Sequence, residues 1–322
     1  RCFCGAQGNM LRYAADWRTL FFVAAYCGLV FTGFYFWDQL ETWMIVVLFI
    51  IMCNSSFFNA VIVHNTIHCP IFKQRWMNKI FQHILSFAYG HAVSAFVPGH
   101  NFSHHKYTQG EKDVMRTTKM RFRWNLLNQL FFFHRMIFNI MRDEGAFAKA
   151  MRKQKPSWYW QYVTELVVFF ATQGVLIYLN WKAFIILVFI PHHYGVWGIV
   201  SVNYWQHDGC DMNHPYNHTR NFTGKVLNWF AFNNGFHGMH HERASLHWSL
   251  LPEWHAKNIA PNVHPALIQT NLFTYLWRST IYPGKRMTYD GKPIPVPPRS
   301  KDADWISELK VDAHLAELGA EG

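Results

Sequence analysis

The histidines of this chain offer the clearest chemistry, because several of them lie close together in the sequence. In the stretch Asn234–Glu242, His237, His240 and His241 follow the pattern HxxHH. Residues spaced i, i+3 and i+4 lie on one face of a helix, so these imidazoles could approach a common point. Imidazole nitrogens bind transition metals, and the cluster is therefore a candidate half of a metal site. Taken alone, it is equally compatible with a polar surface.

Three more segments supply matching histidines. Residues 64–68 read HxxxH, residues 100–105 read HxxxHH, and His207 follows Asn203 by one helical turn. The nine candidate ligands are His64, His68, His100, His104, His105, His207, His237, His240 and His241. Nine imidazoles are too many for one tetrahedral zinc ion and suit two five- or six-coordinate ions. Imidazole binds Fe, Zn, Cu and Ni, so the ligand type does not name the metal.

The elements that must position these histidines are apolar. Four runs lack Asp, Glu, Lys and Arg: residues 20–37, 43–63, 166–181 and 183–205. A bilayer core is crossed by about 20 mostly apolar residues in a helix. We therefore predict four transmembrane helices at about 20–37, 43–63, 159–181 and 183–205. Buried helices of a large soluble protein are the alternative, which the short gap between the first two runs disfavours.

The distribution of basic residues predicts the orientation. Of 30 Lys and Arg, only Lys182 lies in the two short turns between paired runs. By the positive-inside rule, the segments 64–158 and 206–282 are predicted to be cytosolic. The net charge of +11 is thus a topology signal and a contact for lipid headgroups, and no nucleic-acid partner is expected.

All nine histidines follow the cytosolic ends of predicted helices. The uncharged segment 80–97 is diluted by polar residues, and we expect it at the interface or packed against the bundle. Residues 124–141 suit an amphipathic helix on the bilayer face, 226–242 and 267–282 are predicted helices, and 283–322 form an extended tail with a short helix at 303–318. The prediction is one all-α integral membrane domain, residues 1–322, with a cytosolic helical cap that holds a di-metal site.

At this point the chain resembles the membrane fatty acid desaturase and hydroxylase superfamily. Its three histidine boxes match 64–68, 100–105 and 237–241, and Asn203-x-x-x-His207 is similar to the additional ligand motif of acyl desaturases. The resemblance covers about residues 40–242. It implies two non-haem irons bound by the nine histidines, molecular oxygen as co-substrate, and an iron-bound water held by Asn203. Separately, Asp113, Asp208 and Glu242 are candidate acceptors that orient imidazoles.

The resemblance leaves the reaction open. Desaturation of a fatty acyl or lipid chain fits the spacing of the boxes best. Hydroxylation is the alternative, because Asn203–Gly209 resembles alkane hydroxylases, although Gln206 replaces their glutamate. Decarboxylation to an alkene is a further outcome within the superfamily, and a membrane protein that only binds metal is a remote one. No haem, flavin, nicotinamide or iron–sulfur motif occurs in the sequence. We therefore expect an external electron donor, namely a ferredoxin, a rubredoxin or a b-type cytochrome with its reductase.

Overall fold

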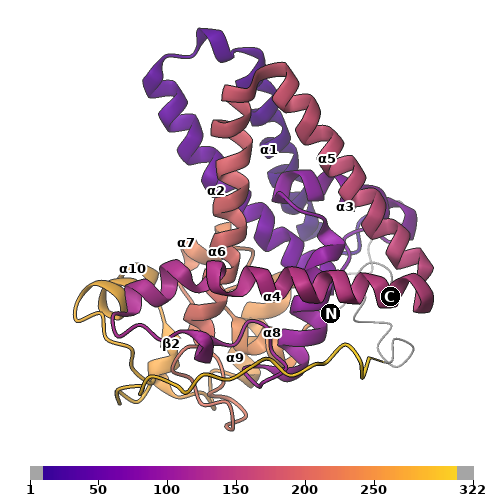
Figure 1. The fold of residues 1–322 in the computed structure, drawn as a ribbon. Helices are drawn as coiled ribbons and strands as arrows, with labels where there is room; N and C mark the ends of the chain where they lie inside the picture. Colours follow the sequence, from indigo (N-terminus) through magenta and orange to yellow (C-terminus); the bar gives the residue numbers. More distant parts are fainter. Residues whose placement is uncertain (1–9, 310–322) are drawn as a thin grey trace.

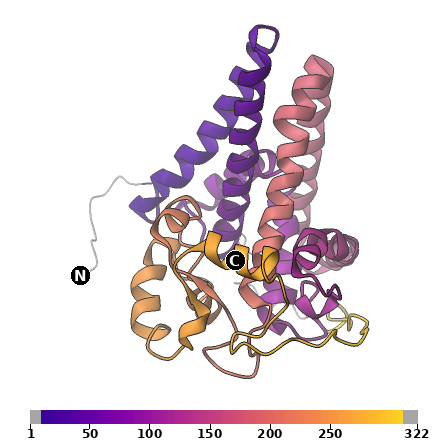
Figure 2. The same cartoon turned by 90° about the vertical axis from the view of Figure 1, so that its left-hand side faces the viewer.

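Long apolar helices rise from a base of short helices and loops in the computed structural model, which describes residues 10–309 (Figures 1 and 2). The long helices are α1 Trp17–Tyr35, α2 Thr42–His68, α5 Pro156–Phe184 and α6 Ile190–His207. Three stretches are long and apolar enough to cross a membrane: Ala14–Tyr35, Thr42–His68 and Pro156–His207. They contain three of the four predicted runs, and the first run, 20–37, extends two residues beyond the end of α1 at Tyr35.

The third stretch, Pro156–His207, consists of two helical arms joined by a break at Asn180. Its 52 residues would measure about 78 Å as one straight helix, far more than the roughly 30 Å of a bilayer core. At Asn180 the backbone leaves the helical region (φ −161°, ψ 98°), and its side-chain oxygen accepts hydrogen bonds from the amides of Lys182 and Ala183 at 3.1 and 3.0 Å. Asn180 therefore caps the start of the second arm. The chain turns there, and the second arm returns to the base through the π-helical turn η6, Ile185–Phe189, and α6 (Figure 1).

Glycines bring α6 against α2. A Cβ added at Gly195 would lie 2.6 Å from Ser56 Oγ, and one at Gly198 would lie 2.7 Å from Phe57 Cδ2. Small residues at helix interfaces in membranes permit this close approach of two backbones. Because the two helices end at His68 and His207, their packing also positions the histidines of the 64–68 segment and His207.

Between α2 and α4, the chain bends sharply. Helix α3 Arg75–Tyr89 and the segment Val93–His105 meet at an angle of 80°, at Gly90 with φ +99°. A side chain at Gly90 would also collide with His192, whose Cβ lies 2.5 Å from the position of an added Cβ. This bend corresponds to the uncharged segment 80–97, and it packs against α2 and α5.

Helix α4, Asn125–Gln154, runs across the base of the long helices (Figure 1). One face buries Phe132, Phe133 and Met136, and the other exposes Phe131 and Phe138. The predicted amphipathic helix is thus present, but it continues well beyond residue 141.

The base contains α7 Lys225–Phe230, α8 His237–Glu242, α9 Leu251–Asn258, α10 Leu272–Leu276 and two paired parallel strands, β1 Asn221–Phe222 and β2 Ile268–Gln269. The predicted single helix over 226–242 is wrong. Phe232 and Asn233 have φ of 47° and 58°, in the left-handed region that ends a helix. The predicted helix at 267–282 begins later, at Leu272, and continues into a π-helical turn. The remaining short helices are η1 Ala14–Asp16, η2 Trp37–Gln39, η3 Val93–Ala95, η4 Pro98–His105, η5 Thr117–Lys119, η7 Trp248–Leu250, η8 Pro265–Leu267 and η9 Trp277–Ile281.

Residues 285–309 form a strap along the base, drawn in yellow in Figure 1. Arg116 and Lys119 both pair with Asp302 of the strap, and Trp305 donates to Asp143 at 3.0 Å. The predicted extended tail is therefore observed as far as residue 309. Residues 303–309 are not helical, and the rest of the predicted helix at 303–318 lies outside the described residues.

Candidate metal centre

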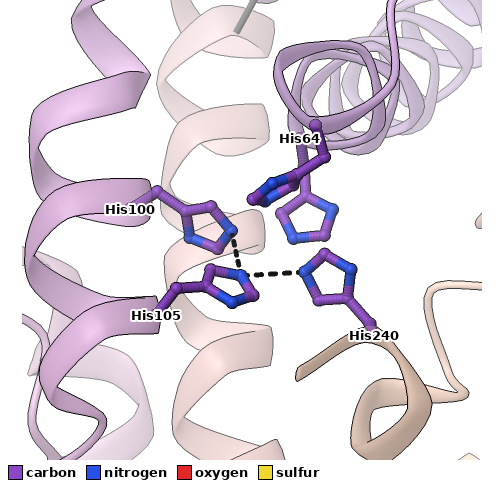
Figure 3. A group of neighbouring side chains, drawn as sticks. His64, His100, His105 and His240 are labelled. Atoms are coloured by element: carbon purple, nitrogen blue, oxygen red, sulfur yellow. Dashed lines mark hydrogen bonds between the residues drawn. The ribbon is translucent and has the colours of Figure 1, made fainter. Parts of the chain in front are cut away.

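The nine histidines meet in two adjoining groups. The first group is His64, His68, His100, His105 and His240, and the second group is His104, His207, His237 and His241. Within each group, one ring nitrogen from every histidine lies within 4.8 Å of the others. The groups are in contact where the rings of His105 and His241 stack, with 4.4 Å between their ring centroids. Figure 3 shows four labelled members of the first group converging from different elements.

A π-helical turn divides the second histidine box between the groups. Residues Pro98–His105 form π-helix η4, in which hydrogen bonds run from i to i+5. This winding brings the rings of His100 and His105 together, with their Nε2 atoms 3.1 Å apart (Figure 3). His104 consequently belongs to the second group. The i, i+4 spacing of His100 and His104 would place both imidazoles on one face of an α-helix, but the π-helical winding separates them.

The third box is divided as well. On α8, His237 and His241 lie one turn apart, with their Nε2 atoms separated by 3.1 Å in the second group. His240 faces the first group, where its Nε2 lies 2.9 Å from that of His105. The expectation that all three imidazoles approach one point is therefore replaced by two points, one for each group.

The nitrogen spacing fits a shared cation. His105 Nε2 lies 3.1 Å from His100 Nε2 and 2.9 Å from His240 Nε2. One Nε2 carries either one hydrogen or one lone pair in the ring plane, so it cannot form good hydrogen bonds to both neighbours. Imidazole nitrogens about 2.1 Å from a metal and at right angles to each other would lie about 3.0 Å apart. The observed spacing matches such an arrangement.

Burial makes the imidazoles suitable ligands. It lowers the pKa of His100, His105, His237, His240 and His241 well below the usual value, and neighbouring histidines lower it further. These rings are therefore neutral at pH 7, which is the form that binds a metal. In addition, the buried Nε2 atoms of His68 and His104 have no hydrogen-bond partner in the part of the chain that the structure describes. Both observations fit metal ions in the two groups.

Two acceptors orient rings of the second group. Asp113 is fully buried and accepts from His104 Nδ1 at 2.9 Å and from the amides of Gln109 and Met115. Burial raises the pKa of Asp113, but His104 and these amides outweigh it, and the net shift is downward. His207 Nδ1 donates to the carbonyl oxygen of His218 at 3.1 Å. In each ring Nε2 is left to face the group.

The remaining predicted residues lie elsewhere. Asp208 pairs with Arg286 and accepts from Tyr204 at 2.9 Å, so its hydrogen bonds serve the strap and α6. Glu242 is exposed at the end of α8. Asn203 is buried and donates to the carbonyl oxygen of Met115 at 3.2 Å. The carbonyl of His218 was missed, because a backbone acceptor carries no signal in the sequence.

An apolar cavity of about 580 Å³ leads away from the histidines. His64, His100, His237 and Asn203 line one end. From there it extends between α4, α5 and α6 to residues of the membrane-depth arms, among them Phe169, Ile177 and Phe184. Its size falls within the range of small-molecule sites, about 300–1,000 Å³.

Comparison with known proteins agrees with this centre. No curated protein matches the chain. The sequence model described as fatty acid desaturase matches residues 41–271, which is more than half of the chain and includes all nine histidines. The chain therefore belongs to the fatty acid desaturase family, within the membrane desaturase and hydroxylase superfamily.

Proposed function

We propose that this protein is an oxygen-dependent membrane oxidoreductase with two non-haem irons, and that it desaturates a fatty acyl or lipid chain. The observation that carries the proposal is the position of nine imidazoles, in two adjoining groups, at one end of a long apolar cavity. Iron is proposed from family membership, since imidazole alone does not distinguish it from other transition metals.

The protein's own residues hold and enclose the reacting groups. Two irons, when bound, supply the reduction of oxygen and the abstraction of hydrogen from an unactivated C–H bond. Each group of histidines would hold one ion, and Asp113 and the carbonyl of His218 fix two of the rings. Side chains such as Phe96 and Ile140 line the cavity and exclude water from the chain that reacts. Asn203 lies at the histidine end, where it can orient a water molecule.

The membrane orientation belongs to the same proposal. The chain crosses the bilayer four times, and both histidine groups lie on the cytosolic side. This arrangement is supported by the basic residues outside the spans and by the break at Asn180. Electrons come from a separate acidic protein, a ferredoxin, a rubredoxin or a b-type cytochrome with its reductase, which binds the basic cytosolic surface.

Metal content and lipid products test the proposal together. Purified protein should contain close to two irons per chain, and lipids from cells that express it should gain double bonds, as measured by mass spectrometry. A variant with His104 and His105 both replaced by Gln is the control, which should be inserted in membranes without changing the lipids. Hydroxylated or chain-shortened products would redirect the reaction within the superfamily. One zinc without iron, or unchanged lipids despite full iron and a reduced donor, would contradict the proposal.

A further inference from the structure

A buried polar side chain projects from α5 within one of the stretches that are long and apolar enough to cross a membrane. Gln173 lies in the first arm of Pro156–His207, and the residue is 8% exposed. Its amide nitrogen is buried and has no hydrogen-bond partner among residues 10–309. Leaving a buried donor unpaired costs roughly 1–3 kcal/mol. A ligand that accepts a hydrogen bond from this amide nitrogen would remove that cost.

Gln173 lines the same cavity as the histidines, but near the other end. Phe169, one turn earlier on α5, lies beside His192 of α6, with 6.3 Å between their ring centroids. Asn203, at the histidine end, is about three helical turns beyond His192, or roughly 16 Å. Gln173 is one further turn in the opposite direction, so on the order of 20 Å separates it from the histidine end.

The cavity excludes a charged group at this depth. None of the described residues that line it is Lys or Arg, and the single carboxylate among them is Glu144. Both oxygens of Glu144 are already used, one by His91 at 3.2 Å and one by Tyr162 at 2.7 Å. A substrate carboxylate or phosphate at the depth of Gln173 would therefore have no Lys or Arg as a counter-ion, and burying it there would be costly.

We infer that Gln173 is a specificity-determining residue for a chain with an uncharged oxygen function, such as a ketone, an alcohol or an ester, at the end remote from the oxidised carbon. The amide nitrogen donates a hydrogen bond to that oxygen. The rest of the chain occupies the apolar cavity and reaches the histidines. This inference rests on the proposed function and adds the chemical class of the substrate to it.

Binding of matched chains to purified protein tests the inference without turnover. The probes are hexadecane and the methyl ketone of the same chain length, bound to protein in nanodiscs and measured by native mass spectrometry. A neutral hydrogen bond is worth about 1 kcal/mol net, so wild-type protein should bind the ketone about fivefold more tightly than the alkane. In Gln173→Leu this preference should disappear, and the alkane should bind at least as well as before.

Thr172→Val is the matched control. It is also a change from polar to apolar on α5, but Thr172 bonds to the carbonyl oxygen of Val168 and does not line the cavity. It should therefore keep the preference for the ketone. Equal binding of ketone and alkane by wild type, as expected if an ordered water satisfies the amide, would overturn this inference alone. The same holds for a preference that survives in Gln173→Leu. If neither chain binds, the cavity does not hold a substrate chain, and the proposed function fails as well.

Discussion

The two histidine groups are built in different ways. The first group takes its members from the end of α2, from η4 and from α8, and the described Nδ1 contact within it is His64 with Asn65 of the same helix, at 3.2 Å. In the second group, His104 and His207 donate their Nδ1 hydrogens to acceptors on two irregular loops, Asp113 and the carbonyl of His218. Helix ends thus position the first group, whereas the second depends also on loops. The loop of Asp113 is in turn held by the strap through Arg116.

The largest expected effect is the loss of one of the two irons when a ligand of either group is replaced. His207→Ala removes a ligand of the second group and should reduce iron from about two to about one per chain, with nearly complete loss of activity. His68→Ala should produce the same stoichiometry through the first group. Inductively coupled plasma mass spectrometry measures the iron. His214→Ala, in the loop beyond α6, is the control and should retain both ions. Full iron in His207→Ala with loss in His214→Ala would show that the wrong histidine has been assigned as the ligand.

A substitution between α2 and α6 should affect both groups at once. In Gly195→Val, the new Cβ would lie 2.6 Å from Ser56 Oγ and 2.9 Å from its backbone carbon, so the helices must separate. Overpacking of this kind costs about 1–3 kcal/mol, and both His68 and His207 would shift. We expect a lower melting temperature and loss of iron from both groups. Gly28→Val has open space around it and should do neither. Wild-type iron content in Gly195→Val would show that the packing of α2 on α6 does not position the groups.

A smaller effect, on metal affinity, should distinguish Asp113, which orients His104, from Asp208, which has only a structural role. Asp113→Asn weakens the acceptor of His104, and changes of this kind typically cost 10–100-fold in metal affinity. The loss should be confined to the second group, as measured by competition with a chelator. Asp208→Asn is the comparison, because Asp208 is also buried but bonds to Arg286 and Tyr204. It should lower stability and leave both affinities nearly unchanged. Equal losses of affinity in the two variants would remove the distinction.

Mild acid should destabilise the metal-free protein gradually. In the folded chain, burial holds the pKa of His100, His105 and His240 in the first group, and of His237 and His241 in the second, well below 6.5. Below about pH 6.5 the unfolded chain binds protons that the folded chain does not, so stability falls as pH falls. Each histidine contributes up to about 1.4 kcal/mol per pH unit. Thermal melting between about pH 7.5 and pH 5.5 measures the slope.

Single variants measure how much each histidine group contributes to this pH dependence of stability. His240→Gln and His241→Gln each remove one such histidine, from the first and the second group respectively. In each variant, unfolding in mild acid should take up about one proton fewer. The slope of the free energy of unfolding against pH should therefore fall by up to about 1.4 kcal/mol per pH unit. Stability that rises on acidification would contradict the burial of neutral imidazoles.

The sequence was sufficient for the features that depend on local composition. The apolar runs predicted the long helices to within a few residues, and the three boxes with His207 predicted the histidines that meet. Features that depend on winding or on distant partners were not predictable. The π-helical turn of η4 has no hydropathy signal, and it alone decides that His100 pairs with His105. The partner of Asp208 is Arg286, 78 residues away, so proximity in sequence to His207 was misleading.

The strap has a consequence for the order in which the protein is made. Asp302 pairs with Arg116 and Lys119, and the loop they belong to carries Asp113, which orients His104. Residue 302 leaves the ribosome after every histidine of both groups. The loop around Asp113 therefore gains these anchors only when synthesis has passed the strap. It follows that the loop that orients His104 is fully anchored only after all nine histidines have been synthesised.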